Sequence, residues 1–166
     1  GVAAAKKDLF QNKCYVIVEK DDVPAEIHNK VCELVKLTGA NLTTLDIAKH
    51  DRCASVISHI PHVAAAALVT LLNRSHGDQE ACLKLAGGGF KDTTRIASSN
   101  ADMWADICMT NSEAIINHIH LLQGILGEVA QAIASGDRQA VHDYFAHSKE
   151  RRDSILEQTK NMYELI

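Results

Sequence analysis

Proline, aromatic residues and net charge are all scarce in this chain. Its 166 residues include two prolines and 4% aromatic residues, and the formal net charge is −4. Proteins that bind nucleic acid usually carry a basic patch or stripe, so the slight acidic excess argues against a nucleic-acid partner. The shortage of proline leaves room for long helices, because proline interrupts helical hydrogen bonding.

A long apolar run is also missing. The longest, residues 63–72, contains Thr70 and is far shorter than the roughly 20 residues that cross a bilayer. Apolar residues make up 46% of the chain and charged residues 23%, which is typical of a folded globule. The sequence therefore predicts a folded protein with no membrane partner.

Targeting and redox motifs are absent as well. Residues 1–7 are partly basic but lack the apolar core of a targeting segment. The five cysteines are odd in number and form no C-x-x-C pair, which is typical of reduced thiols in a cytoplasmic protein. Because the chain starts without Met, we interpret it as a piece of a longer protein.

Residues 1–46 predict a strand, a helix and a second strand. The run 14–18 is β-type, and the following helix begins near Pro24 and ends near Gly39, a suitable residue just after a helix. A second short strand is expected at 41–45. Two strands are marginal in water, so this piece needs a neighbouring sheet or helix.

From residue 47 onward the pattern is helical. Residues 63–72 are apolar on nearly all sides, which predicts a central buried helix or a subunit contact. Pro61 predicts a kink near residues 57–59. The later boundaries are a loop at 75–78, a stop at the glycines 87–89, caps at Asp92 and at 98–100, and a stop at Gly136 before a last helix from Asp137. The fold class is mainly α, a helical bundle preceded by a short strand–helix–strand piece.

The segment 87–95, with the sequence GGGFKDTTR, carries the most chemical information. Glycines allow a ligand to approach the backbone closely, and the N-terminus of the next helix attracts an anion. A helix beginning near Lys91 would place Lys91 and Arg95 on one face, and a guanidinium can bind a carboxylate with two parallel hydrogen bonds. Asp92 stands where a Walker phosphate loop has Ser or Thr. The alternative is a flexible hinge before a helix with two exposed cations.

His59 and His62 are three residues apart and would share a helix face. This spacing suits a metal pair or polar side chains satisfied inside a bundle, and no third ligand at zinc spacing is evident. The chain also lacks a G-x-G-x-x-G dinucleotide motif and a G-x-S-x-G nucleophile motif. The residues by themselves predict a helical domain with a candidate carboxylate-binding pocket.

Three stretches together resemble the prephenate dehydrogenase family. His50-Asp51 with residues 58–62, SHIPH, resembles the family signature H-D…S-H-L-P-H. Residues 85–97, LAGGGFKDTTRIA, resemble its segment G-G-G-F-[RK]-D-x-T-R-I-A. Residues 103–107, MWADI, followed by Asn111, resemble its run M-W-x-D-I…N. The resemblance extends over the whole chain, in order and spacing.

The resemblance implies a two-domain enzyme of tyrosine biosynthesis that oxidatively decarboxylates prephenate to 4-hydroxyphenylpyruvate with NAD. Residues 1–46 would be the end of the nucleotide-binding domain, and residues 47–166 the helical dimerisation and substrate-binding domain. The family's glycine-rich NAD loop is missing here, and its histidine that contacts the substrate hydroxyl would lie before Gly1. We therefore expect a homodimer that contacts prephenate or 4-hydroxyphenylpyruvate, while this piece by itself binds no NAD and has no turnover.

Residue by residue, the resemblance assigns substrate binding to Arg95, Lys91, His62, Gly88 and Trp104. Arg95 matches the family's substrate-binding arginine, and Lys91 and His62 match positions around the pyruvyl side chain. Trp104 is expected to line or cover the pocket, either of its own chain or, by reaching across the dimer, of the partner chain. The expectation is that the guanidinium of Arg95 lies near the two imidazoles.

Three alternatives stay open at this point. Arogenate carries an amino group where prephenate has a keto group, and close relatives use it. A purely structural dimerisation module would have no ligand of its own. A metal-dependent hydrolase would use His50, Asp51, His59 and His62.

Overall fold

The computed structural model describes residues 5–75 and 78–164, with side chains as far as Thr159. Two compact units make up the chain. The first unit comprises residues 1–50 together with 124–166, and the second unit comprises residues 51–123. Each unit is described by itself. The middle of the loop expected at 75–78 lies outside the described residues. The domain boundary expected after residue 46 stays a prediction.

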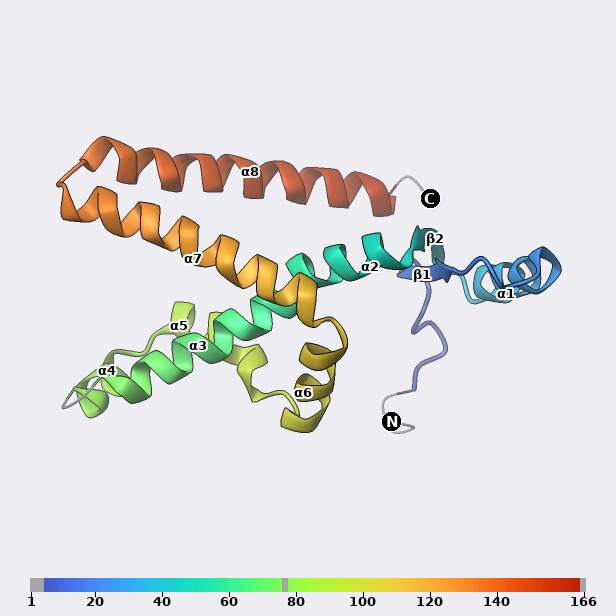
Figure 1. Ribbon diagram of the computed structural model, residues 1–166, viewed down its shortest axis with the longest axis horizontal. Helices are drawn as coiled ribbons and strands as arrows, with labels where there is room; N and C mark the ends of the chain where they lie inside the picture. Colours follow the sequence, from blue (N-terminus) through green and yellow to red (C-terminus); the bar gives the residue numbers. More distant parts are fainter. Residues whose placement is uncertain (1–4, 76–77, 165–166) are drawn as a thin grey trace. The chain divides into compact units, whose positions relative to one another are not determined.

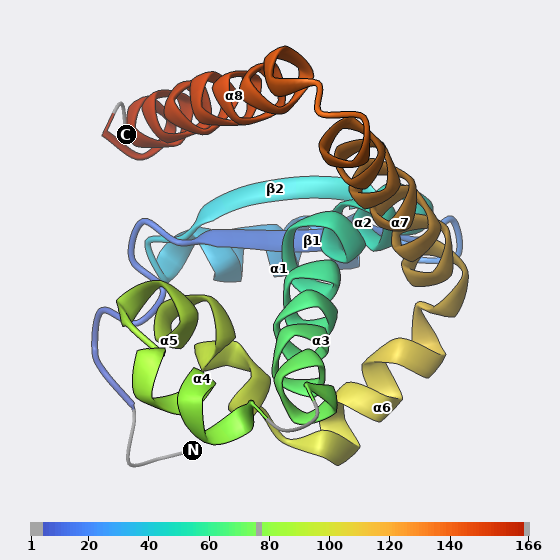
Figure 2. The same ribbon diagram turned by 90° about the vertical axis from the view of Figure 1, so that its left-hand side faces the viewer.

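The first unit contains the predicted strand–helix–strand. Strand β1 (Cys14–Glu19) pairs in parallel with β2 (Asn41–Asp46), in a register that places Cys14 opposite Asn41. Helix α1 (Ala25–Leu37) connects the strands and packs along the sheet (Figure 2). Val35 on α1 and Ala40 just before β2 are the buried apolar residues of this small core.

Local sequence signals set the ends of α1. Pro24 directly precedes the helix, as its N-cap, because it has no N–H to leave unpaired. Gly39 has φ of +76°, the left-handed conformation in which a side chain is strained. The predicted stop at Gly39 is therefore confirmed, and the turn lets Asn41 begin the second strand.

A long helical segment follows β2 and runs to Arg74. It consists of α2 (Ile47–Ala54), the π-helical turn η2 (Ser55–His59) and α3 (Ile60–Arg74). Pro61 cannot donate a backbone hydrogen bond, and its ring would crowd the preceding turn. The wider π-helical turn directly before it accommodates this, and the kink predicted near residues 57–59 stays a prediction.

The apolar stretch in this segment is longer than the run of residues 63–72 identified in the sequence. Residues Ile47–Arg74 form a stretch long and apolar enough to cross a membrane by length and composition, with mean hydropathy 1.7 in the best window. Core helices of soluble proteins pass the same test but are mostly buried, whereas 11% of this window is buried. The run 63–72 underestimated the length of the apolar helical stretch, because the helix continues through the π-turn and Pro61.

The region of the three glycines differs from the prediction. Helix α4 (Gln79–Leu85) ends before them, but α5 (Gly88–Thr94) starts within them, with Gly87 as its N-cap. Asp92 therefore lies inside α5 and is not a cap, which corrects the expected boundary. Helix α5 leads directly into the 3-10 turn η3 (Arg95–Ser98), so the irregular connection is short.

Three further helices complete the chain (Figure 1). They are α6 (Ala101–Thr110), α7 (Ser112–Ala134) and α8 (Arg138–Glu164). Asn100 caps α6 by accepting a hydrogen bond from the Met103 N–H at 2.8 Å, as the sequence predicted. Gly136, with φ of +69°, ends α7, and the Asp137 carboxylate accepts from the Ala140 N–H at 2.9 Å at the start of α8.

Charged pairs on the surface of α8 shift two pKa values. A hydrogen bond from His142 lowers the pKa of the Asp143 carboxyl. The hydrogen bond from Lys149 to Asp153 raises the pKa of the Lys149 ammonium. Both groups are fully exposed, so these pairs add little stability.

Candidate functional site

His62 occupies the first turn of α3, just after the π-helical turn. Its Nδ1 lies 2.9 Å from the Ser58 carbonyl oxygen. A carbonyl oxygen only accepts hydrogen bonds, so Nδ1 must carry the proton. In the neutral ring Nε2 is therefore the bare nitrogen, which leaves it available to a ligand.

Trp104 on α6 joins His62 to a second histidine. Its indole stacks on the His62 imidazole, with ring centroids 3.9 Å apart and planes inclined by 27°. His59 meets the same indole edge-on, with centroids 6.0 Å apart and an angle of 81°. Two sequence motifs, SHIPH on the π-turn and α3 and MWADI on α6, are thus brought together around one aromatic ring.

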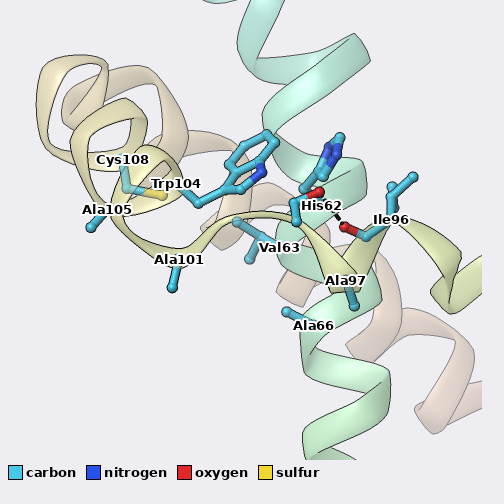
Figure 3. Close-up of a pocket in the computed structure, with 10 residues that line it drawn as sticks. His62, Val63, Ala66, Ile96, Ala97, Ala101, Trp104, Ala105 and Cys108 are labelled. Atoms are coloured by element: carbon cyan, nitrogen blue, oxygen red, sulfur yellow. Dashed lines mark hydrogen bonds between the residues drawn. The ribbon is translucent and has the colours of Figure 1, made fainter. Parts of the chain in front are cut away.

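A cavity of about 420 Å³ lies beside this aromatic cluster (Figure 3). It is bounded by the first turns of α3, by the η3 segment and by α6, and its surface is mainly apolar. The lining residues are His62, Val63, Ala66, Ile96, Ala97, Ser99, Ala101, Trp104, Ala105 and Cys108. Its size and its small number of polar groups are typical of a small-molecule site.

The Trp104 indole nitrogen forms no hydrogen bond within the described part of this cluster. Its Nε1 is buried and has no hydrogen-bond partner among the residues the structure describes. A buried N–H without a partner costs about 1–3 kcal/mol. Trp104 is therefore held by ring packing and not by a hydrogen bond from its indole N–H.

The glycine segment borders a second, separate cavity of about 570 Å³. Leucines of α3 and residues of α4 and the α4–α5 connection form its apolar wall, including Leu68, Leu72, Cys82, Gly87, Gly89 and Phe90. A Cβ built at Gly87 or Gly89 would meet no atom within 4 Å. The packing of the described chain thus gives no reason for these glycines, although glycine in a helix costs about 1 kcal/mol relative to alanine.

The predicted site residues fall into two groups. His62 and Trp104 line the first cavity together. Arg95 and Lys91 are exposed and line neither cavity described above, and Gly88 is the first residue of α5. Arg95 directly precedes Ile96, a lining residue of the first cavity. The expected approach of the Arg95 guanidinium to the imidazoles is thus not a feature of this cavity.

Both exposed cations are free to bind an anion. Across residues 5–75 and 78–164, neither Lys91 nor Arg95 forms an ion pair with a carboxylate. An unpaired guanidinium keeps all its donors in water until an acceptor arrives. The segment therefore retains the cationic character that the sequence indicated.

Sequence reasoning gave no role to two polar contacts that tie α7 and its N-terminus to the π-turn. Asn111, between α6 and α7, contacts both Asp51 and His59. His118 Nδ1 lies 2.8 Å from the Oγ of Ser55, which is fully buried. Asn111 had been noted only as part of a motif, because no local pattern reveals a partner 52 residues away.

The histidines that the structure describes do not form a metal centre with acidic or thiol ligands. Within the described part of the chain, no three His, Cys, Asp or Glu residues are grouped as a metal site would require. His62 instead stacks on the Trp104 indole and His59 meets it edge-on. Nothing in this grouping favours the hydrolase alternative.

An acidic hollow lies at the carboxyl ends of β1 and β2. Four carboxylates and one ammonium contribute to its wall, from Glu19, Lys20, Asp21, Asp22 and Asp46. Parallel sheets commonly bind ligands at this end of their strands. The excess of negative charge here would repel a phosphate group.

Comparison with known proteins gives a consistent family signal. The sequence model described as "Prephenate dehydrogenase, dimerization domain" matches residues 46–147. The prephenate dehydrogenase of Bacillus subtilis (strain 168) is 33% identical over 93% of this chain and 42% of its own length. The cyclohexadienyl dehydrogenase of Zymomonas mobilis is 25% identical over 92% of this chain and 52% of its own length.

Among solved structures, prephenate dehydrogenase from A. aeolicus, in complex with hydroxyphenyl propionate and NAD+, superposes with a TM-score of 0.87. It is 28% identical, and the match covers 93% of this chain and 54% of that one. The chain thus spans about half or less of the length of the relatives it matches.

Proposed function

The chain belongs to the prephenate dehydrogenase family, and we propose that it supplies the dimerisation surface and the substrate-carboxylate contacts of an NAD-linked cytoplasmic dehydrogenase of tyrosine biosynthesis. The reaction is the oxidative decarboxylation of prephenate to 4-hydroxyphenylpyruvate. The chain acts as part of that enzyme and has no turnover by itself.

The stacking of His62 on Trp104 beside an apolar cavity is the observation that supports this proposal most. The flat indole and the aliphatic wall suit a six-membered carbon ring, because such a ring buries apolar surface on both faces. His62 adds one polar nitrogen at the edge of that wall. A site of this kind binds a ring compound that carries a small number of polar groups.

The carboxylates of the substrate require cations. Arg95 is our proposed principal contact, with Lys91 as a second positive charge on the preceding turn. The His62 Nε2 can donate to a carboxylate oxygen when the imidazole is protonated. Gly88 offers backbone without a side chain next to these cations. Loss of carbon dioxide from the ring is then favoured by formation of the aromatic product.

NAD does not fit the strand–helix–strand piece of this chain. The turn between β1 and α1 has no G-x-G-x-x-G sequence and carries Asp21 and Asp22, which line the acidic hollow. Carboxylates in that position oppose a pyrophosphate, whereas dinucleotide sites present glycine backbone N–H groups. We therefore assign hydride acceptance to NAD held elsewhere in the enzyme and route no step through this chain.

A homodimer is proposed for a physical reason. Several large apolar side chains on α7 are at least half exposed, among them Leu121 at 61%, Leu126 at 56% and Ile133 at 63%. Exposed apolar surface of this extent is favourable only when another surface covers it. The matched family model, named for dimerisation, supports a second copy of the same domain as the cover.

Calorimetric titration of the purified chain tests the proposal. We expect saturable binding of prephenate and of 4-hydroxyphenylpyruvate, and no binding of NAD. Binding of neither ring compound at millimolar concentration would favour a purely structural dimerisation module. Micromolar NAD affinity would contradict the assignment of the cofactor to another part of the enzyme.

Arogenate remains the second candidate substrate, because its ring and ring carboxylate are the same as in prephenate. The two differ at the side-chain amino or keto group. A titration with both compounds under the same conditions decides between them, and tighter binding of arogenate would replace prephenate in the proposal.

A further inference from the structure

Asn111 connects three parts of the second unit. It follows the last residue of α6 and precedes α7, and its backbone N–H donates to the Ile107 carbonyl. Its side-chain nitrogen donates to the backbone carbonyl of Asp51 on α2 at 2.8 Å. The same nitrogen lies 3.3 Å from Nδ1 of His59 in the π-turn.

The orientation of the Asn111 amide follows from its partners. The Asp51 carbonyl oxygen only accepts hydrogen bonds, so the amide must turn its NH₂ group toward it. An inverted amide would place two acceptor oxygens against each other. The NH₂ group has two hydrogens, and the second one is directed to His59 Nδ1.

This contact fixes the proton position on His59. A nitrogen that accepts a hydrogen bond from Asn111 carries no proton of its own, so the neutral ring holds its proton on Nε2. His62 has the opposite arrangement, with its proton on Nδ1 toward the Ser58 carbonyl. The two imidazoles that contact Trp104 therefore have opposite tautomers.

We propose that Asn111 is a positioning residue, which holds His59 as the Nε2–H tautomer and so sets the ring that packs edge-on against Trp104 of the candidate site. His59 lies with its centroid 6.0 Å from the indole, while His62 covers the indole face. Rotation of His59 would remove one support of the Trp104–His62 stack. Asn111 thus acts on the cavity through His59, without lining the cavity itself.

The tautomer is directly measurable. In a long-range proton–nitrogen NMR spectrum of the ¹⁵N-labelled chain at a pH where the rings are neutral, His59 should carry its proton on Nε2 and His62 on Nδ1. The chain has nine histidines, so His59→Gln and His62→Gln identify the two signals by their loss. His62 then serves as a reference of the opposite kind in the same sample.

Asn111→Asp is the variant that tests the hydrogen bond to His59 most directly. A carboxylate oxygen accepts hydrogen bonds, so it favours a proton on His59 Nδ1 and should reverse the tautomer. Asn117→Asp is the matched control, because Asn117 is an exposed asparagine on α7 and receives the same charge change. The control should leave the His59 signal unchanged.

The fluorescence of Trp104 provides a second readout, since it is the single tryptophan of the chain. Asn111→Asp should change its emission intensity and Asn117→Asp should not. A proton on Nδ1 of His59 in the unmodified chain would overturn the proposal, and this measurement needs no Asn111 variant, only the two histidine variants that assign the signals. A folded Asn111→Asp chain with an unchanged His59 tautomer would overturn it as well.

The consequence for ligand affinity rests on the proposed function. We expect Asn111→Asp to weaken 4-hydroxyphenylpyruvate binding about tenfold, and Asn117→Asp to leave it unchanged. If the unmodified chain shows the expected tautomers but binds no ring compound, the proposed function fails and the role of Asn111 stands. If the ligand binds but the tautomers are reversed, the role of Asn111 fails and the function stands.

Discussion

Arg95 is the residue on which substrate recognition depends in our proposal. Its guanidinium is exposed and has no carboxylate partner among the described residues, so binding an anion requires no existing ion pair to break. A charge-assisted hydrogen bond to a carboxylate contributes about 1.5–3 kcal/mol. The same exposure means that its removal should leave the fold intact.

Arg95→Ala should therefore weaken binding of prephenate about 10- to 150-fold, which corresponds to that energy. Titration calorimetry of the chain measures this directly. Arg151→Ala on α8 is the control, because it removes an equally charged and exposed side chain from the other compact unit. Equal affinities for the Arg95 and Arg151 variants would remove Arg95 from the substrate site.

Single residues with specific backbone requirements set where the helices end or change geometry. Gly136 ends α7 with φ of +69°, and no atom lies within 4 Å of a Cβ built there. Its requirement is therefore conformational and not steric, since the left-handed region costs other residues about 1–2 kcal/mol. Pro61 acts by the loss of a donor and produces the π-turn that carries Ser58 and His59.

At this scale we predict that Gly136→Ala lowers the free energy of unfolding by about 1–2 kcal/mol. For a chain of this length, each kcal/mol corresponds to a fall in Tm of about 2–4 °C. Circular dichroism on heating measures the change. Gly136→Asn should cost clearly less, because asparagine tolerates the left-handed region, and equal losses for both variants would contradict this explanation.

At the scale of the whole molecule, many large apolar side chains are exposed among the described residues. The best 18-residue window of the Ile47–Arg74 segment is 11% buried, and α7 exposes Leu126 and Ile133 on one face, seven residues apart. Covering such side chains contributes about 1.5–3 kcal/mol each. The molecule as a whole is therefore expected to function as an assembly.

Sedimentation velocity at micromolar concentration should accordingly show a dimer. The double variant Leu126→Glu with Ile133→Glu should shift the chain to monomer, because two carboxylates would be buried at the apolar contact. Gln131→Glu adds a charge at an exposed polar position of the same helix and should leave the dimer intact. A monomer in the unmodified chain would refute the dimer.

The amino-acid sequence by itself determined the strand–helix–strand order, the stops at Gly39 and Gly136 and the cap at Asn100. These features depend on neighbours within a few residues, so composition and spacing carry them. The family motifs likewise came from the sequence. The sequence prediction that this helix begins near Lys91 was wrong, since α5 begins at Gly88 despite the low helix propensity of glycine.

Only the tertiary structure decided which side chains meet. The stack of His62 on Trp104, the link from Asn111 to His59 and the position of Arg95 outside the cavity depend on how α3, η3 and α6 pack. Contacts between residues far apart in the chain are set by the fit of whole helices, which no local pattern records. The cavity and the tautomers of its two histidines follow from that fit.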